Sequence, residues 1–196
     1  MSASFESWIT TLRDRLTSPP PRRLPTADLR PAAVLVPLYV EAGELWTVLT
    51  KRTDHLPSHR SQIAFPGGAR ELGEDPWEAA LRETHEEIGL DPKRVLRIGI
   101  LNEGETPAGF RVIPCVGAVP FPLETKPNRD EIAEVFSLPL SAFSNPQMVE
   151  ERTITVNGVD REIRVYHVGK RQIWGLTARI LQNLLVRLGL EAEEED

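Results

Sequence analysis

The residues with the clearest chemical potential are three glutamates, Glu83, Glu86 and Glu87, which lie close together in the chain. If this segment is helical, their i, i+3 and i+4 spacing places all three carboxylates on one face, because each residue turns a helix by about 100°. Repulsion between like charges at these spacings disfavours a helix by about 0.2–0.5 kcal/mol per pair. Hard divalent cations such as Mg²⁺ prefer carboxylate oxygens and often bind phosphates as well, so a shared metal would remove the repulsion. Helix geometry alone leaves two interpretations open: a metal site, or a solvated acidic surface.

The same segment carries strong signals for a helix over residues 77–88. Asp75 can cap its start, Pro76 suits the first helical position, and Glu78 completes a capping box. Gly89 follows the helix, where a left-handed residue is common. A second face carries the residues that we expect to enter the core: Trp77, Ala80, Leu81, Thr84 and Ile88. The glutamate face lies about 120° away from that core face.

The spacing around these glutamates resembles the Nudix box. It runs from Gly68 through five residues to Glu74, then through seven residues to the segment 82–90. The family pattern is Gly, five residues, Glu, seven residues, then Arg-Glu-aliphatic, one residue, Glu-Glu, one residue and Gly-aliphatic. The one departure is Thr84, which stands where an aliphatic residue is usual and belongs to the core-facing side. The resemblance implies the Nudix fold, an α/β (α+β) architecture with a mixed β-sheet sandwiched between helices.

The resemblance also implies catalytic roles for Arg82, Glu83, Glu86 and Glu87. The three glutamates would be the ligands of Mg²⁺ or Mn²⁺, with any one of them instead orienting the attacking water. Arg82 would pair with a box glutamate, and Glu74 would support the metal shell directly or through water. The reaction would be attack of water on phosphorus, with the metal polarising the phosphate.

The segment before the box resembles the upstream signature of coenzyme A pyrophosphatases within the Nudix superfamily. Residues 48–53 and 62–68 match that signature well. Pro57 departs from it where arginine is often found, and Ser61 where glycine is usual. Together with weaker matches further along the chain, the resemblance covers roughly residues 31 to 185. It implies hydrolysis of coenzyme A or its derivatives to 4′-phosphopantetheine and 3′,5′-ADP.

A basic cluster in this upstream segment favours a substrate with several phosphates. It comprises Lys51, Arg52, His55, His59 and Arg60 in a chain of net charge -6. Arginine can bind phosphate through paired hydrogen bonds. The alternative is a solvated loop with an ion pair to Asp54. We expect the substrate-binding residues to be Lys51, Arg52, His59, Gln62, Gly67 and Gly68.

Other residues are weaker candidates, each with a structural alternative. Glu103 and Glu105 would supply an extra metal ligand or a general base, or belong to a surface loop. Phe110 and Trp174 would stack on adenine, or pack in the core. Cys115 lies in an apolar run and is expected to be a buried, inert thiol.

Two other functions remain open at this level. One is a Nudix hydrolase for another nucleoside diphosphate derivative, such as ADP-ribose or a dinucleoside polyphosphate. The other is a non-catalytic nucleotide-binding Nudix module. Such modules usually lose box glutamates, whereas this chain keeps all of them.

The surrounding elements suggest how the site is positioned. Residues 1–30 would form an N-terminal helix over 5–16 and a proline-rich linker, residues 31–190 the Nudix hydrolase domain, and residues 191–196 an acidic tail. The N-terminal helix would pack on the domain or on a partner, which leaves a homodimer open. The expected domain elements are strands 32–40, 45–50, 63–65, 95–102, 110–119 and 131–139, a hairpin of 153–156 with 163–166, and a helix 174–188.

Composition narrows the partners and the compartment. With 40% hydrophobic and 27% charged residues, the 196-residue chain has the composition of a globular protein. A net charge of -6 argues against nucleic acid and anionic membranes as partners and leaves a small-molecule nucleotide substrate. A lone cysteine and the lack of a signal-like start predict a cytoplasmic location.

Overall fold

Strand β1 (Arg30–Glu41) organises the larger of two sheets in the computed structural model, which describes residues 5–25, 28–53, 62–156 and 158–192. It pairs in parallel with β7 (Phe110–Ala118) and antiparallel with β2 (Glu44–Arg52) and β4 (Gly67–Ala69). This eight-stranded sheet has the order β3-β2-β1-β7-β5, with β4 on β1, β6 on β7 and β8 on β2. Its other strands are β3 (Ile63–Ala64), β5 (Leu96–Ile100), β6 (Gly104–Glu105) and β8 (Ile132–Pro139). The sheet is therefore mixed, as predicted.

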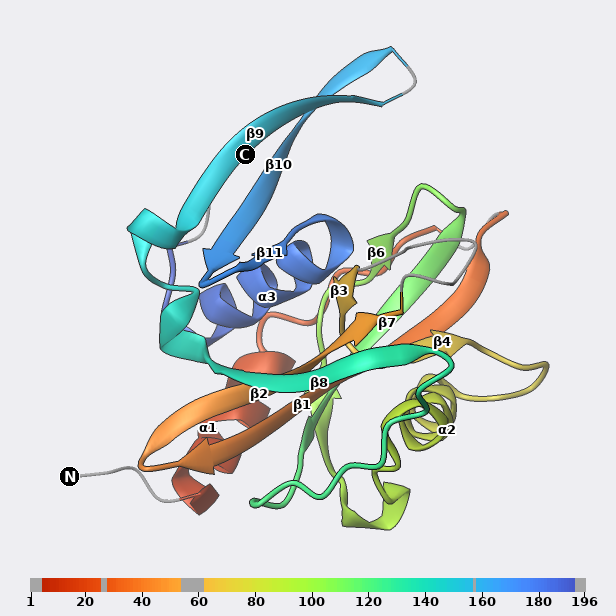
Figure 1. Cartoon of the computed structure of the whole chain (residues 1–196), viewed down its shortest axis with the longest axis vertical. Helices are drawn as coiled ribbons and strands as arrows, with labels where there is room; N and C mark the ends of the chain where they lie inside the picture. Colours follow the sequence, from red (N-terminus) through yellow and green to blue (C-terminus); the bar gives the residue numbers. More distant parts are fainter. Residues whose placement is uncertain (1–4, 26–27, 54–61, 157, 193–196) are drawn as a thin grey trace.

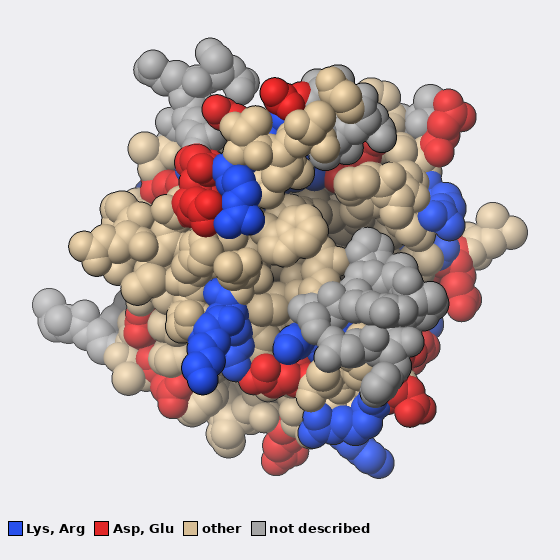
Figure 2. All heavy atoms as spheres, turned by 45° about the horizontal axis from the view of Figure 1, so that its top comes forward, with Lys and Arg blue, Asp and Glu red and all other residues tan. Residues whose placement is uncertain are grey.

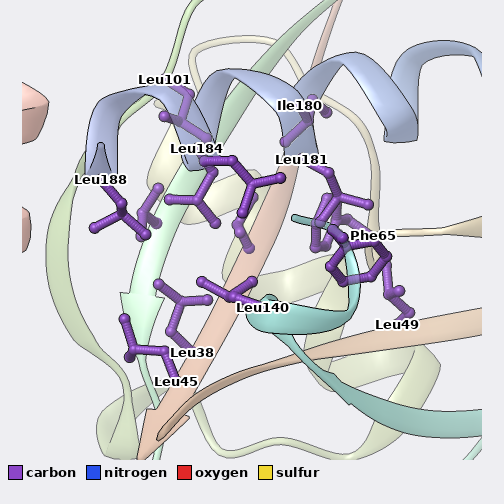
Figure 3. Close-up of a cluster of buried hydrophobic side chains, with 14 of the residues drawn as sticks. Leu38, Leu45, Leu49, Phe65, Leu101, Leu140, Ile180, Leu181, Leu184 and Leu188 are labelled. Atoms are coloured by element: carbon purple, nitrogen blue, oxygen red, sulfur yellow. The ribbon is translucent and has the colours of Figure 1, made fainter. Parts of the chain in front are cut away.

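Three α-helices cover the two faces of this sheet (Figure 1). They are α1 (Phe5–Thr17), α2 (Pro76–Ile88) and α3 (Gly175–Leu188). Successive residues of β1 point to opposite faces: Leu35 packs in the cluster that includes α2, and Val36 in the cluster that includes α1 and α3. Figure 3 shows the second cluster, with leucines of α3 above the strands. The predicted sheet between helices is confirmed.

Helix α1 packs on its own domain. Ile9, Leu12 and Leu16 are buried on its inner face, and Leu12 and Leu16 join the same core cluster as α3. A fully buried leucine contributes about 1.5–3 kcal/mol, so this contact stabilises the fold substantially. We expected this helix to pack either on the domain or on a partner, and the structure shows it packed on the domain.

A separate antiparallel sheet of three strands stands beside the larger one. It consists of β9 (Val149–Val156), β10 (Val159–Val168) and β11 (Arg171–Ile173). In Figure 1 its long hairpin extends away from the layered body. The pairing of Val156 with Val159 confirms the predicted hairpin, but both strands are longer than expected and the return strand begins before residue 163. Residue 157 of the predicted turn lies outside the described residues. Short 3-10 turns complete the described elements at Pro92–Arg94, Leu140–Ala142 and Pro146–Met148.

The main difference from expectation concerns Gly67–Ala69 (β4). The expected strand of this region covers residues 63–65 and none was expected over 67–69, whereas β4 joins the sheet beside Ala32, Ala33 and Val34 of β1. A Cβ atom on Gly67 would lie 2.4 Å from the carbonyl oxygen of Ala33. Side-chain patterns do not predict such a strand, because its glycines have no side chains to alternate.

Charges of both signs are interspersed on the face shown in Figure 2. Neither the basic nor the acidic side chains form a continuous surface there. Within the described ranges, no helix combines the length and apolarity that crossing a bilayer requires.

Candidate functional site

The candidate site is built on helix α2, whose start is fixed by the predicted cap. The Asp75 carboxylate accepts hydrogen bonds from the backbone N–H groups of Trp77 at 2.7 Å and Glu78 at 3.0 Å. The Glu78 carboxylate accepts in return from the Asp75 N–H at 2.8 Å, which completes the capping box. At the other end Gly89 adopts a left-handed conformation with φ of 73°. These caps fix which residues of the helix face the sheet.

Arg82 joins the loop before the helix to its acidic face. Its Nε and Nη2 donate to the two carboxylate oxygens of Glu74 at 2.9 and 3.1 Å. Its Nη1 donates to Glu83 Oε1 at 2.9 Å and lies 3.5 Å from Glu86 Oε2. Hydrogen bonding to Arg82 lowers the pKa of Glu74. Glu74 thus contacts Arg82 with both oxygens and positions this guanidinium between Glu83 and Glu86.

Glu83 lies against the backbone of Gly68. A Cβ atom at position 68 would come within 2.6 Å of the Glu83 carboxylate carbon and one of its oxygens. Contacts this short do not occur for real Cβ atoms, so any larger residue would displace the carboxylate. Glycine at position 68 therefore leaves room for the Glu83 carboxylate in its present position.

Glu87 is the most buried of the three predicted ligands, with 5% of the residue exposed. Its Oε2 accepts a hydrogen bond from the Gly67 N–H at 3.0 Å, and its Oε1 lies 3.5 Å from Nη1 of Arg52. Burial raises the pKa of Glu87 to about 7, although the Gly67 hydrogen bond and the Arg52 charge oppose this shift. A nearby cation would stabilise the ionised form of a carboxylate buried in this way.

The donor chemistry of these residues fits a hard divalent cation, because all the predicted ligands offer carboxylate oxygens. Across the described residues, however, no three His, Cys, Asp or Glu side chains are grouped closely enough to hold an ion. Glu83 and Glu87 both lie at the Gly67–Gly68 backbone, whereas the Glu86 side chain is 57% exposed and meets Arg82. Arg82 and Arg52 supply positive charge to Glu83 and Glu87 in this arrangement. The set of Glu83, Glu86 and Glu87 stays a prediction.

The predicted substrate-binding residues converge only in part. Arg52 ends β2 beside β3, where its N–H donates to the carbonyl oxygen of Gln62 at 3.1 Å, and its side chain reaches Glu87. Lys51 precedes it on β2 and pairs in register with Ile63. His59, together with His55, Pro57, Arg60 and Ser61, lies outside the described residues. The structure therefore brings Arg52, Gly67 and Gly68 together around Glu83 and Glu87.

The weaker candidates occupy varied surroundings. Buried Glu103 accepts a hydrogen bond from the Leu24 N–H at 2.7 Å and lies 3.9 Å from Arg111. Phe110 is covered by the guanidinium of Arg30, 4.0 Å from the ring centroid. Trp174 is 46% exposed at the start of α3. These placements give Glu103 a role in fixing the linker and leave only Trp174 with a free aromatic surface.

Cys115 is fully buried, and burial raises the pKa of its thiol to about 12. It is therefore inert at neutral pH, as expected from the apolar run around it.

Sequence reasoning missed the contacts that join distant segments at this site. The Gly67 N–H donor to Glu87 and the ion pair between Arg52 and Glu87 span 20 and 35 residues respectively. The capping box and the glutamate spacing are local signals, but no local signal exists for these two contacts.

Comparison with known proteins points to one family. The NUDIX domain profile matches residues 29–156. A protein of Enterobacter sp. (strain 638) named Uncharacterized Nudix hydrolase NudL is 36% identical over 163 residues, which cover 83% of this chain and 84% of that protein. The protein of the same name from Pectobacterium atrosepticum is 35% identical over 173 residues, covering 86% and 88%.

Solved structures agree with this assignment. The Nudix hydrolase RenU from M. smegmatis is 26% identical with a TM-score of 0.50, covering 57% of this chain and 71% of that one. A MutT/nudix family protein from Enterococcus faecalis has a TM-score of 0.55 at 20% identity, covering 98% and 72%. The second likeness shows the fold alone.

Proposed function

The chain belongs to the Nudix hydrolase family, and from this premise we propose that it hydrolyses the pyrophosphate bond of coenzyme A or a derivative. The products would be 4′-phosphopantetheine and 3′,5′-ADP. Nudix hydrolases cleave pyrophosphate bonds in nucleoside diphosphate derivatives and generally use divalent metal ions. The proposal adds a substrate, and it assigns Mg²⁺ or Mn²⁺ to Glu83, Glu86 and Glu87.

One observation carries the proposal: the contact between Arg52 and Glu87. Arg52 belongs to the upstream segment that resembles the coenzyme A pyrophosphatase signature, and Glu87 belongs to the Nudix box. Their side chains lie 3.5 Å apart, and Gly67 of the same upstream segment donates to Glu87. These contacts between the two motifs support the proposal that Arg52 binds substrate beside a metal held by Glu87.

The residues of the chain would contribute in two ways: some would bind or balance charge, and others would hold the reacting groups in position. A bound metal would polarise the phosphate and activate water. Arg82, held by Glu74, keeps Glu83 oriented toward the Gly68 backbone. Arg52 can bind a phosphate oxygen with the same guanidinium that contacts Glu87. The buried position of Glu87 limits water around the carboxylate and strengthens its interaction with a cation.

A substrate panel tests the proposal. Purified protein is incubated with Mg²⁺ or Mn²⁺ and either coenzyme A, 3′-dephospho-coenzyme A, ADP-ribose or a dinucleoside polyphosphate, and the products are identified by mass spectrometry. We expect coenzyme A to give the highest kcat/KM. If ADP-ribose is preferred by a wide margin, the substrate assignment is wrong although the family assignment stands.

A further inference from the structure

A groove of about 380 Å³ runs along α3, on the sheet face opposite α2. Asn102–Gly104 and Arg22 of the linker also line it. The helix contributes residues of one stripe, chiefly Leu176, Arg179 and Asn183. Three segments that are far apart in the sequence thus enclose it.

Hydrogen bonds fix these segments to one another. Arg22 N–H donates to the side-chain oxygen of Asn102 at 2.8 Å, and Glu103 N–H donates to the Arg22 carbonyl oxygen at 2.9 Å. The side-chain oxygen of Asn183 accepts from the Asn102 N–H at 3.0 Å. Because both amide oxygens are engaged as acceptors, the side-chain NH₂ groups of Asn102 and Asn183 remain as donors without a partner among the described residues. The groove is therefore ordered and rich in hydrogen-bond donors.

Positive charge gathers at the groove. Arg22 and Arg179 both line it, and neither is within ion-pair distance of a carboxylate in the described parts of the chain. Partial desolvation and the positive charges of Arg22 and Arg161 lower the pKa of Arg179, and the Glu105 carboxylate opposes this shift. The one carboxylate in the lining, Glu103, accepts from the Leu24 N–H and faces Arg111. In the described parts of the chain the groove thus carries two guanidinium groups that form no ion pair, although the Glu103 and Glu105 carboxylates lie nearby.

We propose that this groove binds a phosphate group. The guanidinium groups of Arg22 and Arg179 would hold the phosphate, and the side-chain NH₂ groups of Asn102 and Asn183 would donate hydrogen bonds to it. Guanidinium groups bind phosphate through paired, charge-assisted hydrogen bonds, and neutral amide donors add directionality. An apolar or cationic ligand would leave Arg22 and Arg179 without a counter-ion, whereas a phosphate would supply one.

The groove reaches the end of the sheet that carries the candidate active site. Arg179 donates to the carbonyl oxygen of Glu105 on β6, and pairing then leads through β7 and β1 to Ala69 on β4. Adjacent strands are spaced by about 4.8 Å, so three steps correspond to roughly 15 Å. The phosphate is therefore either a further phosphate of an extended substrate or a separate small ligand.

The first test is binding of inorganic phosphate to the metal-free full-length protein in EDTA, followed by ¹H–¹⁵N NMR of the side-chain amides. We expect saturable shifts of the Asn102 and Asn183 signals. Affinity should fall at least tenfold in the double variant Arg22→Gln/Arg179→Gln and recover largely in Arg22→Lys/Arg179→Lys. Arg13→Gln, which removes an exposed arginine of α1, is the matched control and should bind like the wild type.

Two results would overturn the proposal. One is the absence of amide shifts at Asn102 and Asn183, and the other is equal phosphate affinity in the wild type and the glutamine double variant. Backbone spectra of each variant show whether the fold is retained, and the lysine variant separates lost charge from local disorder. None of these measurements requires hydrolysis, so they decide the proposal even if the substrate assignment fails.

A second arm, which rests on the proposed function, identifies the source of the phosphate. The glutamine double variant is compared with the wild type on coenzyme A and on 3′-dephospho-coenzyme A. A rise in KM for coenzyme A alone, with kcat unchanged, supports the groove as the site of the substrate's additional phosphate. Unchanged KM values for both substrates, together with phosphate binding in the first arm, support a separate phosphate ligand.

Discussion

The carboxylate of Glu83 rests against Gly68 so closely that a Cβ atom there would lie 2.6 Å from it. Glu83 therefore has its position only because residue 68 has no side chain. Gly68 and Glu74 are the first and second fixed positions of the Nudix box. Gly68 contacts Glu83 and Glu74 contacts Arg82, so both positions make direct contact with helix α2.

Gly68→Ala is expected to lower kcat by at least about tenfold, since ~1.4 kcal/mol of lost transition-state stabilisation suffices for that change. The Ala methyl group would push the Glu83 carboxylate away from its place beside Glu87. Steady-state kinetics with a thermal melt measures the effect. Gly73→Ala is the control, because a Cβ there meets nothing within 4 Å and only the φ of +85° is strained. Equal kcat values for the two variants would argue against this role of Gly68.

Glu87→Gln is expected to abolish turnover while the protein stays folded. The amide oxygen of Gln can still accept the hydrogen bond from Gly67. A neutral side chain at this buried position also avoids the desolvation cost of a charged one. Turnover and thermal stability are measured together, with exposed Glu71→Gln as the control. Unchanged turnover in Glu87→Gln would exclude the metal assignment.

Arg52→Gln is expected to tighten Mn²⁺ binding several-fold in the absence of substrate and to raise KM. The guanidinium now balances the charge of Glu87, so its removal leaves that carboxylate available to a cation. Isothermal titration calorimetry at pH 8.5 measures the affinity. Lys51→Gln removes an equal charge from the neighbouring residue and controls for the overall field. If both variants bind Mn²⁺ equally, the direct contact is not the cause.

Cys115 is expected to resist thiol reagents at pH 8 in the native protein. Burial raises its pKa to about 12 from the ordinary value of 9.0, so the thiolate is scarce and also shielded. Labelling with a chromogenic disulfide should follow the unfolding transition in urea. Rapid labelling without denaturant would show that the strand opens locally.

Asp75→Ala is expected to destabilise the protein by about 0.5–2 kcal/mol, the usual loss for an N-cap. The variant loses two hydrogen bonds at the start of α2. Urea unfolding gives the difference, and Asp75→Asn, which keeps an acceptor oxygen, should recover most of it.

Local signals explain what could be predicted from the sequence. The extent of α2 followed from its caps and its 3.6-residue period, and both features lie within 15 residues of chain. The mixed sheet between helices was expected from the resemblance to the Nudix family. By contrast, β4 has two glycines and β6 only two residues, so neither shows a hydrophobic alternation.

The site could be predicted only as far as local spacing reaches. The positions of Glu83, Glu86 and Glu87 on one helix were evident, but not that Glu87 would be buried against Arg52 while Glu86 stays exposed. Burial of a helix residue depends on which strand lies beside the helix, and this is set by the pairing of strands that are far apart in the sequence. The groove of Arg22 and Arg179 depends on the same kind of contact, across more than 150 residues.

Helices α1 and α3 lie outside residues 29–156, yet Leu12, Leu16, Leu181 and Leu184 close one face of the sheet. A gene fragment limited to the matched region would encode the glutamate helix without the hydrophobic lining behind it. Such a fragment is expected to aggregate on expression, because the apolar face of its sheet would be left open to solvent.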